Sequence, residues 1–337
     1  MDGWETRRKR TIGHDFCIIK MGISGFIDHF CIDTAHFTGN HAPRVSIQGI
    51  YIRSECEVLK WLEHEWQNGS RIGKFASKAQ FEQIDKIQSE SWQMVLPFSL
   101  LGPGYDDTKL NVFQVEKSAR GPFTHLRVNI FPDGGIARIK AFGQPFMHKS
   151  KFSDSKHHLL DLVSLKNGGS IIGSTNSHYG KPINLIMPGR GKVMGDGWET
   201  ARRLDRPAIL TVDERGFMNV TGKEWVIVRL GNLGKVSKIL IDTNLFKGNF
   251  PESVEVEGTK VDQSGDIVES DLENCHWKIL LIRSKVLGHC ENIFEREIAD
   301  IGPINVIKLT IFPDGGVMRL RVHGSLATQG TTFESKL

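Results

Sequence analysis

The sequence predicts an all-β protein made of two tandem, galactose-binding-like β-sandwich repeats of the jelly-roll type. Two observations lead to this prediction. The same three sequence blocks occur twice in the same order, which indicates an internal duplication. Many short apolar runs, bounded by turn residues, lie between and around these blocks, and this pattern is typical of β-sandwiches. One polar stretch, Ser77–Ser89, has helical spacing and is expected to form a helix.

The repeated blocks are long enough to be specific. The first is Asp-Gly-Trp-Glu-Thr with following arginines, at residues 2–8 and again at residues 196–203, where Ala201 reads as an insertion. The second is Ile-Asp-Thr with Phe-x-Gly-Asn, at residues 32–40 and 241–249. The third is Ile-Phe-Pro-Asp-Gly-Gly, at residues 130–135 and 311–316.

The spacing of the blocks predicts how the chain is divided. We expect a first repeat at residues 1–143, a linker at 144–160, a second repeat at 161–325 and a flexible tail at 326–337. Asp33 and Asp242 are 209 positions apart, whereas Pro132 and Pro313 are 181 apart, so the first repeat carries 28 more residues between these blocks. The extra residues fall around 53–91 and are interpreted as an elaborated surface loop.

Each repeat is expected to close with a β-hairpin around its Pro-Asp-Gly-Gly turn, because proline and glycine supply the angles that tight turns need. In the second repeat, alternation places Met318, Leu320 and Val322 on one strand face. Arg319, Arg321 and His323 then lie on the other face.

Composition and motifs exclude several classes of protein. The 43 basic and 39 acidic residues give a net charge of +4, and no dense basic run contains interleaved aromatic residues, so we expect no nucleic-acid partner. No apolar stretch is long enough to span a bilayer, so no membrane partner is expected. The five cysteines fit no zinc spacing, and neither a metal nor another cofactor is predicted. Nucleophile-elbow, Walker and dinucleotide motifs are absent from the sequence.

The last three residues, Ser335, Lys336 and Leu337, match the C-terminal tripeptide that the peroxisomal import receptor reads. They predict a peroxisomal location with that receptor as a partner. Without the signal, the protein is expected to be cytoplasmic.

Taken together, the three blocks resemble those of the allantoicase family over nearly all of residues 2–324. The resemblance implies two jelly-roll repeats, assembly into a homo-oligomer, and hydrolysis of allantoate to ureidoglycolate and urea. A catalytically inactive relative, or a β-sandwich that binds a ligand without turnover, is the alternative. The sequence departs from the family pattern where Leu245 occupies the position of His36.

Allantoate is a carboxylate with two ureido groups, so its site needs a cation, polar partners and an acid or base. The candidate catalytic residues are Glu5, Glu199, Asp33, His36 and Asp242. The candidate substrate-binding residues are Arg7, Arg8, Arg202, Arg203, Asn40, Asn249, Arg138 and Arg319. Structural roles are the alternative for all of them. Asp133 and Asp314 are predicted to be structural, and Trp4 and Trp198 to anchor the cores.

The two repeats differ in what precedes their first block. Residues 162–194 lead into the second repeat, and the apolar runs 170–172 and 183–187 are expected to cover part of its core. The first block follows Met1 directly, so we expect an unpaired edge at residues 16–21 and exposed apolar side chains there.

Overall fold

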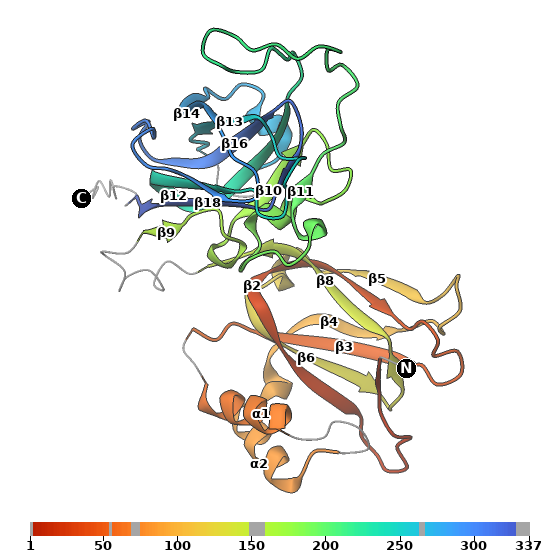
Figure 1. Cartoon of the computed structure of the whole chain (residues 1–337). Coiled ribbons are helices and arrows are strands. Elements are labelled where there is room, and N and C mark those ends of the chain that lie inside the picture. The colour runs from red at the N-terminus through yellow and green to blue at the C-terminus, as the bar shows by residue number, and fades with distance from the viewer. Residues whose placement is uncertain (1–2, 54–55, 69–74, 148–158, 263–266, 328–337) are drawn as a thin grey trace, which may run out of the picture. The chain divides into compact units, whose positions relative to one another are not determined.

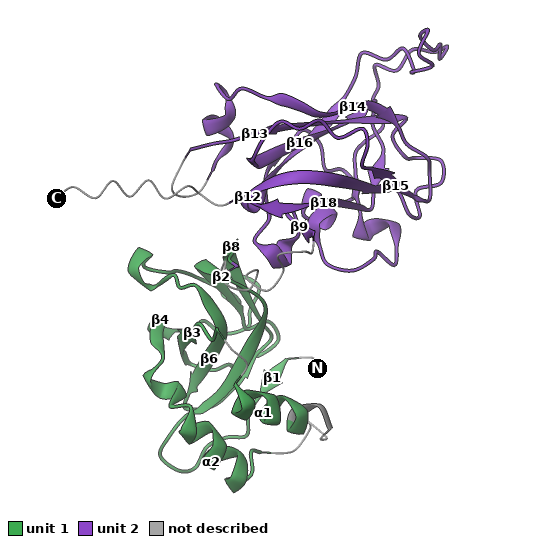
Figure 2. Ribbon diagram, turned by 90° about the vertical axis from the view of Figure 1, so that its left-hand side faces the viewer, with its two compact units in different colours: residues 1–146 green, residues 147–337 purple. Residues whose placement is uncertain are grey.

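The computed structural model describes residues 3–53, 56–68, 75–147, 159–262 and 267–327. The chain forms two compact units, residues 1–146 and 147–337 (Figures 1 and 2). Both are built mainly from antiparallel strands, so the predicted all-β class with two repeated sandwiches is confirmed. Most of the predicted linker, 144–160, lies outside the described residues.

The first unit is organised around β2, a strand of 19 residues. The first part of β2 pairs with β6, and its last part lies between β5 and β8, so one strand serves both layers of the sandwich. The path of the larger sheet is β4-β3-β6-β2-β5, and β1 pairs separately with β7. The strands are β1 (Trp4–Glu5), β2 (Asp15–Asp33), β3 (Arg44–Ile50), β4 (Gln93–Leu100), β5 (Leu110–Gln114), β6 (Phe123–Phe131), β7 (Gly135–Ile136) and β8 (Arg138–Pro145).

The second unit repeats this plan around β12, which also has 19 residues. The first part of β12 pairs with β16, and its last part lies between β15 and β18. Two further strands, β9 and β10, have no counterparts among the described strands of the first unit. The strands are β9 (Leu160–Asp161), β10 (Ser170–Ser174), β11 (Trp198–Glu199), β12 (Glu224–Asp242), β13 (Ser253–Thr259), β14 (Lys278–Lys285), β15 (Glu291–Phe294), β16 (Ile304–Phe312), β17 (Gly316–Val317) and β18 (Arg319–Leu326).

Alternating residues of the long strands fill the apolar core of each unit. In the second unit Leu320 and Val322 belong to the core and Met318 is fully buried, as their predicted shared face requires. Trp198 is also fully buried in this core, which confirms its predicted role, and Trp4 packs against the core of the first unit.

The predicted hairpin at the Pro-Asp-Gly-Gly turn is wrong. Strands β6 and β8 flank the turn in sequence, yet β2 lies between them in the sheet. The turn makes its hydrogen bonds to other segments, because the Gly134 amide donates to Thr6 Oγ1 at 3.2 Å and the Gly135 amide donates to the Asn40 carbonyl at 2.8 Å. The turn therefore joins the first and second sequence blocks instead of closing a hairpin.

The extra stretch of the first repeat is more ordered than the predicted surface loop. It contains α1 (Glu57–Asn68), which the sequence did not predict, and α2 (Lys78–Lys86), which lies within the predicted helix. Ser77 caps α2 and forms a capping box with Gln80. The following residues Ser89 and Glu90 accept hydrogen bonds from the buried guanidinium of Arg127, at 2.6 and 3.0 Å, so the end of this stretch is tied to β6.

Candidate functional site

The first and second sequence blocks meet in each unit through one carboxylate–amide pair. Asn40 Nδ2 donates to Glu5 Oε1 at 2.6 Å, and Asn249 Nδ2 donates to Glu199 Oε1 at 2.5 Å. The glutamates lie on the two-residue strands β1 and β11, while the asparagines follow the long strands. Both asparagines are exposed, so each pair lies at the surface, where it can meet a ligand.

Matching hydrogen bonds show which residues after Glu5 correspond to which residues after Glu199. The backbone amide of Lys9 donates to Asp133 Oδ2 at 2.7 Å, and that of Arg203 donates to Asp314 Oδ2 at 2.9 Å. Lys9 is therefore equivalent to Arg203, Arg8 to Arg202 and Arg7 to Ala201, and the inferred insertion at Ala201 is wrong. Asp133 and Asp314 have the predicted structural role, since they tie the first block to the third.

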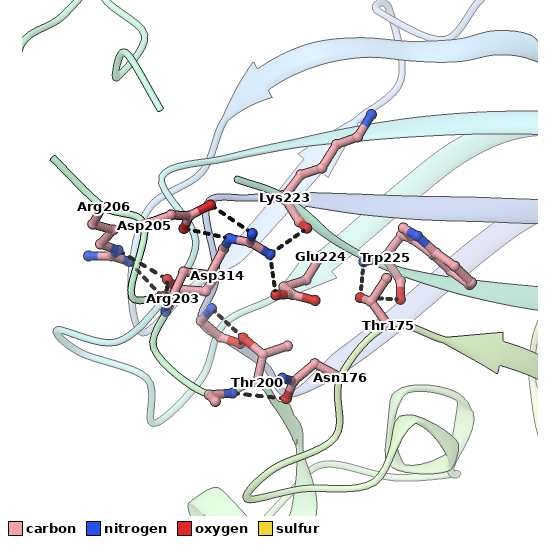
Figure 3. Close-up of polar contacts among 12 residues, drawn as sticks. Thr175, Asn176, Thr200, Arg203, Asp205, Arg206, Lys223, Glu224, Trp225 and Asp314 are labelled. Atoms are coloured by element: carbon pink, nitrogen blue, oxygen red, sulfur yellow. Dashed lines mark hydrogen bonds and ion pairs between the residues drawn. The ribbon is translucent and has the colours of Figure 1, made fainter. Parts of the chain in front are cut away.

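Arg203 is occupied by carboxylates, as Figure 3 shows. Its guanidinium binds Asp205 through two bonds of 2.9 and 2.8 Å and Glu224 through one of 2.8 Å, which raises the pKa of Arg203 further. The equivalent Lys9 forms an ion pair of 2.7 Å with Asp15. The same pairing at equivalent positions favours the structural alternative for Arg203 over the predicted contact with substrate.

Arg202 and Arg8 are differently placed. Both side chains are exposed, and within the described residues neither guanidinium has a hydrogen bond or an ion pair. Arg202 lies three residues after Glu199, so it is the available cation nearest in sequence to that carboxylate. Arg7 is also exposed, and its guanidinium lies 5.7 Å from the ring centroid of Phe75.

Arg319 and Arg138 are equivalent in sequence but not in environment. Arg319 is only 6% exposed and donates to the carbonyls of Gly189 and Asp196 at 3.0 and 2.6 Å, and burial lowers its pKa. These bonds hold the segment before β11 against β18, which favours the structural alternative for Arg319. Arg138 is exposed and bonds the carbonyl of Ala137.

The two aspartates at the ends of the long strands hold turns. Asp33 Oδ1 accepts from the Ala35 amide, and Asp242 Oδ1 accepts from the Asn244 amide, both at 2.8 Å. Asp242 is 2% exposed, and this burial raises its pKa. These contacts favour the structural alternative for both aspartates.

Leu245 occupies the position of His36 in the second unit, and a histidine from a distant part of the sequence contacts it. His36 and Leu245 share a φ of 70°, so their turns match, and His36 is exposed. In the second unit, His289 Nδ1 accepts from the Leu245 amide at 2.8 Å. Nε2 is therefore the ring nitrogen left to contact another group, and His289 is exposed. Sequence reasoning missed His289 because it lies 44 residues away from Leu245.

A second group missed by the sequence lies beside Asp242. Arg190 forms an ion pair of 3.6 Å with Glu291, which is the direct cross-strand neighbour of Asp242. The first unit has Leu110 at the position of Glu291. Glu291 comes beside Asp242 through the register of β15 with β12, which sequence spacing does not show.

Metal ligation finds no support in the described part of the chain, where no group of three or more His, Cys, Asp or Glu side chains could hold an ion. No helix in that part is long and apolar enough to cross a membrane.

Comparison with known proteins identifies this arrangement. The family model described as "Allantoicase repeat" matches residues 1–146 and 160–327. The chain belongs to the allantoicase family. It is 37% identical over 328 residues to "Probable allantoicase" of Pseudomonas syringae pv. syringae, covering 97% of this chain and 83% of that protein. "Probable allantoicase 1" of Burkholderia mallei is 36% identical, with coverage of 97% and 81%.

A solved structure agrees with the sequence relatives. The crystal structure of allantoicase from Saccharomyces cerevisiae matches with a TM-score of 0.65 and 30% identity, covering 96% of this chain and 81% of that one. The resemblance predicted from the three repeated blocks is thereby confirmed.

Proposed function

We propose that this protein is an allantoicase that hydrolyses allantoate to ureidoglycolate and urea at the Glu199–Asn249 pair of the second unit. The family match carries the reaction. The observation that supports this site is a partly exposed, oriented carboxylate, Glu199, three residues before an arginine whose guanidinium has no partner among the described residues. In the second unit, residues 176–189 also contact the repeated blocks, since the Asn176 carbonyl accepts from Trp198 Nε1 and the Gly189 carbonyl accepts from Arg319.

Each residue of this site has a distinct role in the proposal. Arg202 binds the substrate carboxylate through a charge-assisted bond. Asn249 holds the carboxylate of Glu199 in one orientation, and Glu199 takes a proton from the attacking water. The water oxygen bonds to the central carbon as the bond from that carbon to nitrogen breaks. Glu199 then returns the proton to the nitrogen that leaves with urea, so protons balance within one turnover.

Measuring urea released from allantoate by the purified chain tests this function. A Glu199→Gln variant serves as the control, because it keeps the hydrogen bond from Asn249 but removes the base. Turnover by the wild type with a loss in the variant supports the proposal. Tight binding of allantoate without urea release in the wild type would favour the inactive, ligand-binding alternative.

Location and assembly are separate proposals that rest on the sequence and its resemblance. The Ser335-Lys336-Leu337 signal lies outside the described residues, and the bacterial relatives lend it no support. A fluorescent protein fused ahead of the chain should enter peroxisomes through the import receptor. Extra residues added after Leu337 should leave it in the cytosol, and a cytosolic signal from both fusions would refute the address. We also propose a homo-oligomer, which light scattering of the purified protein tests directly.

A further inference from the structure

A histidine side chain takes the place of a backbone carbonyl in the second unit. In the first unit, the carbonyl of Gly104 accepts from the His36 amide at 3.3 Å. In the second unit, the matching amide of Leu245 donates to Nδ1 of His289 at 2.8 Å. A Cβ at Gly104 would lie 2.1 Å from the Thr34 carbonyl oxygen, so no side chain fits there. The first unit therefore cannot present a ring from this position.

His289 combines an oriented ring with a strained backbone. A neutral imidazole that accepts a hydrogen bond at Nδ1 carries its proton on Nε2, so the ring offers one donor. The residue is exposed, and its Nε2 has no hydrogen bond within the described part of the chain. Its φ of 57° lies in the left-handed region, which glycine adopts without a steric penalty. Strain of this kind concentrates at functional sites, so it points to a use for the side chain.

The loop that carries His289 packs on both sides of Asn249. The His289 amide donates to the carbonyl of Phe246, three residues before Asn249, at 3.0 Å. A Cβ at Gly288 would lie 2.5 Å from the ring of Phe250, the residue after Asn249. The chain from Phe246 to Asn249 spans at most about 11 Å. The His289 ring and the carboxylate–amide pair made by Asn249 therefore lie beside one turn, close enough to contact one small ligand.

We propose that His289 binds substrate in the second unit, by donating a hydrogen bond from Nε2 to a ureido carbonyl oxygen of allantoate. This inference rests on the proposed function of the Glu199–Asn249 pair. Arg202 is assigned there to the carboxylate of allantoate and Glu199 to the transferred proton, which leaves the ureido oxygens without a donor. Asn249 Nδ2 already donates to Glu199, whereas Nε2 of His289 is available. A neutral donor suits a neutral carbonyl oxygen.

The test measures binding of allantoate by calorimetry to the full chain with Glu199→Gln, which keeps the pair but lacks the base. His289→Asn is added to this background, because the new side-chain oxygen can still accept from the Leu245 amide and asparagine tolerates a positive φ. The substitution removes the Nε2 donor. His36→Asn, which changes the exposed histidine of the first unit, is the matched control. The nitrogen NMR resonance of His289 Nε2 is also recorded with and without allantoate.

We expect His289→Asn to raise the dissociation constant about three- to tenfold through the loss of one hydrogen bond, and His36→Asn to leave it unchanged. Allantoate should also shift the Nε2 resonance. An unchanged dissociation constant in His289→Asn, an equal rise in His36→Asn, or an unshifted Nε2 resonance would overturn the proposal.

The proposed function has a separate readout. If the wild type binds allantoate through His289 but releases no urea, hydrolysis is refuted and this contact stands. If the wild type releases urea and His289→Asn binds as the Glu199→Gln parent does, the contact is refuted and hydrolysis stands. A parent that does not bind allantoate refutes both the contact and the placement of the site.

Discussion

Replacing Arg203 by alanine should destabilise the second unit without affecting substrate binding directly. The change leaves Glu224, whose side chain is 6% exposed, without its ion-pair partner. Breaking a buried pair in this way costs about 3–5 kcal/mol, and the 29% exposure of the Arg203 side chain favours the lower figure of about 3 kcal/mol. In a unit of this size that corresponds to a fall in Tm of roughly 6–12 °C.

Calorimetry that resolves the transition of the second unit measures this effect. Glu224→Gln in the Arg203→Ala background should recover part of the loss, because it removes the unpaired charge. The neighbouring Arg202→Ala is the matched control, with a change within about 0.5 kcal/mol in stability and a raised KM for allantoate. If Arg203→Ala leaves the Tm unchanged, or Arg202→Ala lowers it as much, the assignment of these two roles is refuted.

Two further predictions concern burial in the second unit. Burial raises the pKa of Asp242, so its contribution to stability is present at low pH and is lost as pH rises through the folded-state pKa. The stability of Asp242→Asn relative to wild type, measured by urea denaturation, should therefore rise between about pH 4 and pH 7.5. A difference in stability that does not change with pH would contradict this. Gly316→Ala should lower the free energy of unfolding by about 1–3 kcal/mol, since the added Cβ would lie 2.1 Å from the Phe246 ring. Gly248→Ala is the control, because its added Cβ would meet nothing within 4 Å. Equal losses of stability in both variants would show that contact with Phe246 does not determine the effect at residue 316.

The repeated blocks allowed the fold class to be predicted because each block has a structural task that the duplication preserved. Trp198 fills a core, and alternation in β18 follows directly from the strand period. The hairpin prediction failed because alternation looks the same whether β6 pairs with β8 or with a third strand between them. Helix α1 was missed although Val58, Leu59 and Leu62 have helical spacing, because the whole stretch around 53–91 was interpreted as a polar surface loop.

Only part of the candidate site could be predicted, because several of its contacts join residues that are far apart in the sequence. Glu199 and Asn249 were both candidates because each belongs to a repeated block, and the structure joins them by a hydrogen bond, while their roles stay a prediction. The role of Arg203 depends on Glu224, 21 residues away, and the place of His289 depends on a turn 44 residues away. Sequence spacing carries no information about such contacts, so Arg203 was assigned to substrate binding and His289 was not considered.

The rate of urea release by two equivalent variants tests the central claim most directly. Glu199→Gln removes the proposed base of the second unit, and Glu5→Gln makes the same change at the equivalent pair of the first. The account predicts that Glu199→Gln lowers kcat by about 10²–10⁴-fold while Glu5→Gln leaves it within a few-fold of wild type. A wild-type rate in Glu199→Gln, or an equal loss in Glu5→Gln, would contradict the placement of catalysis at Glu199.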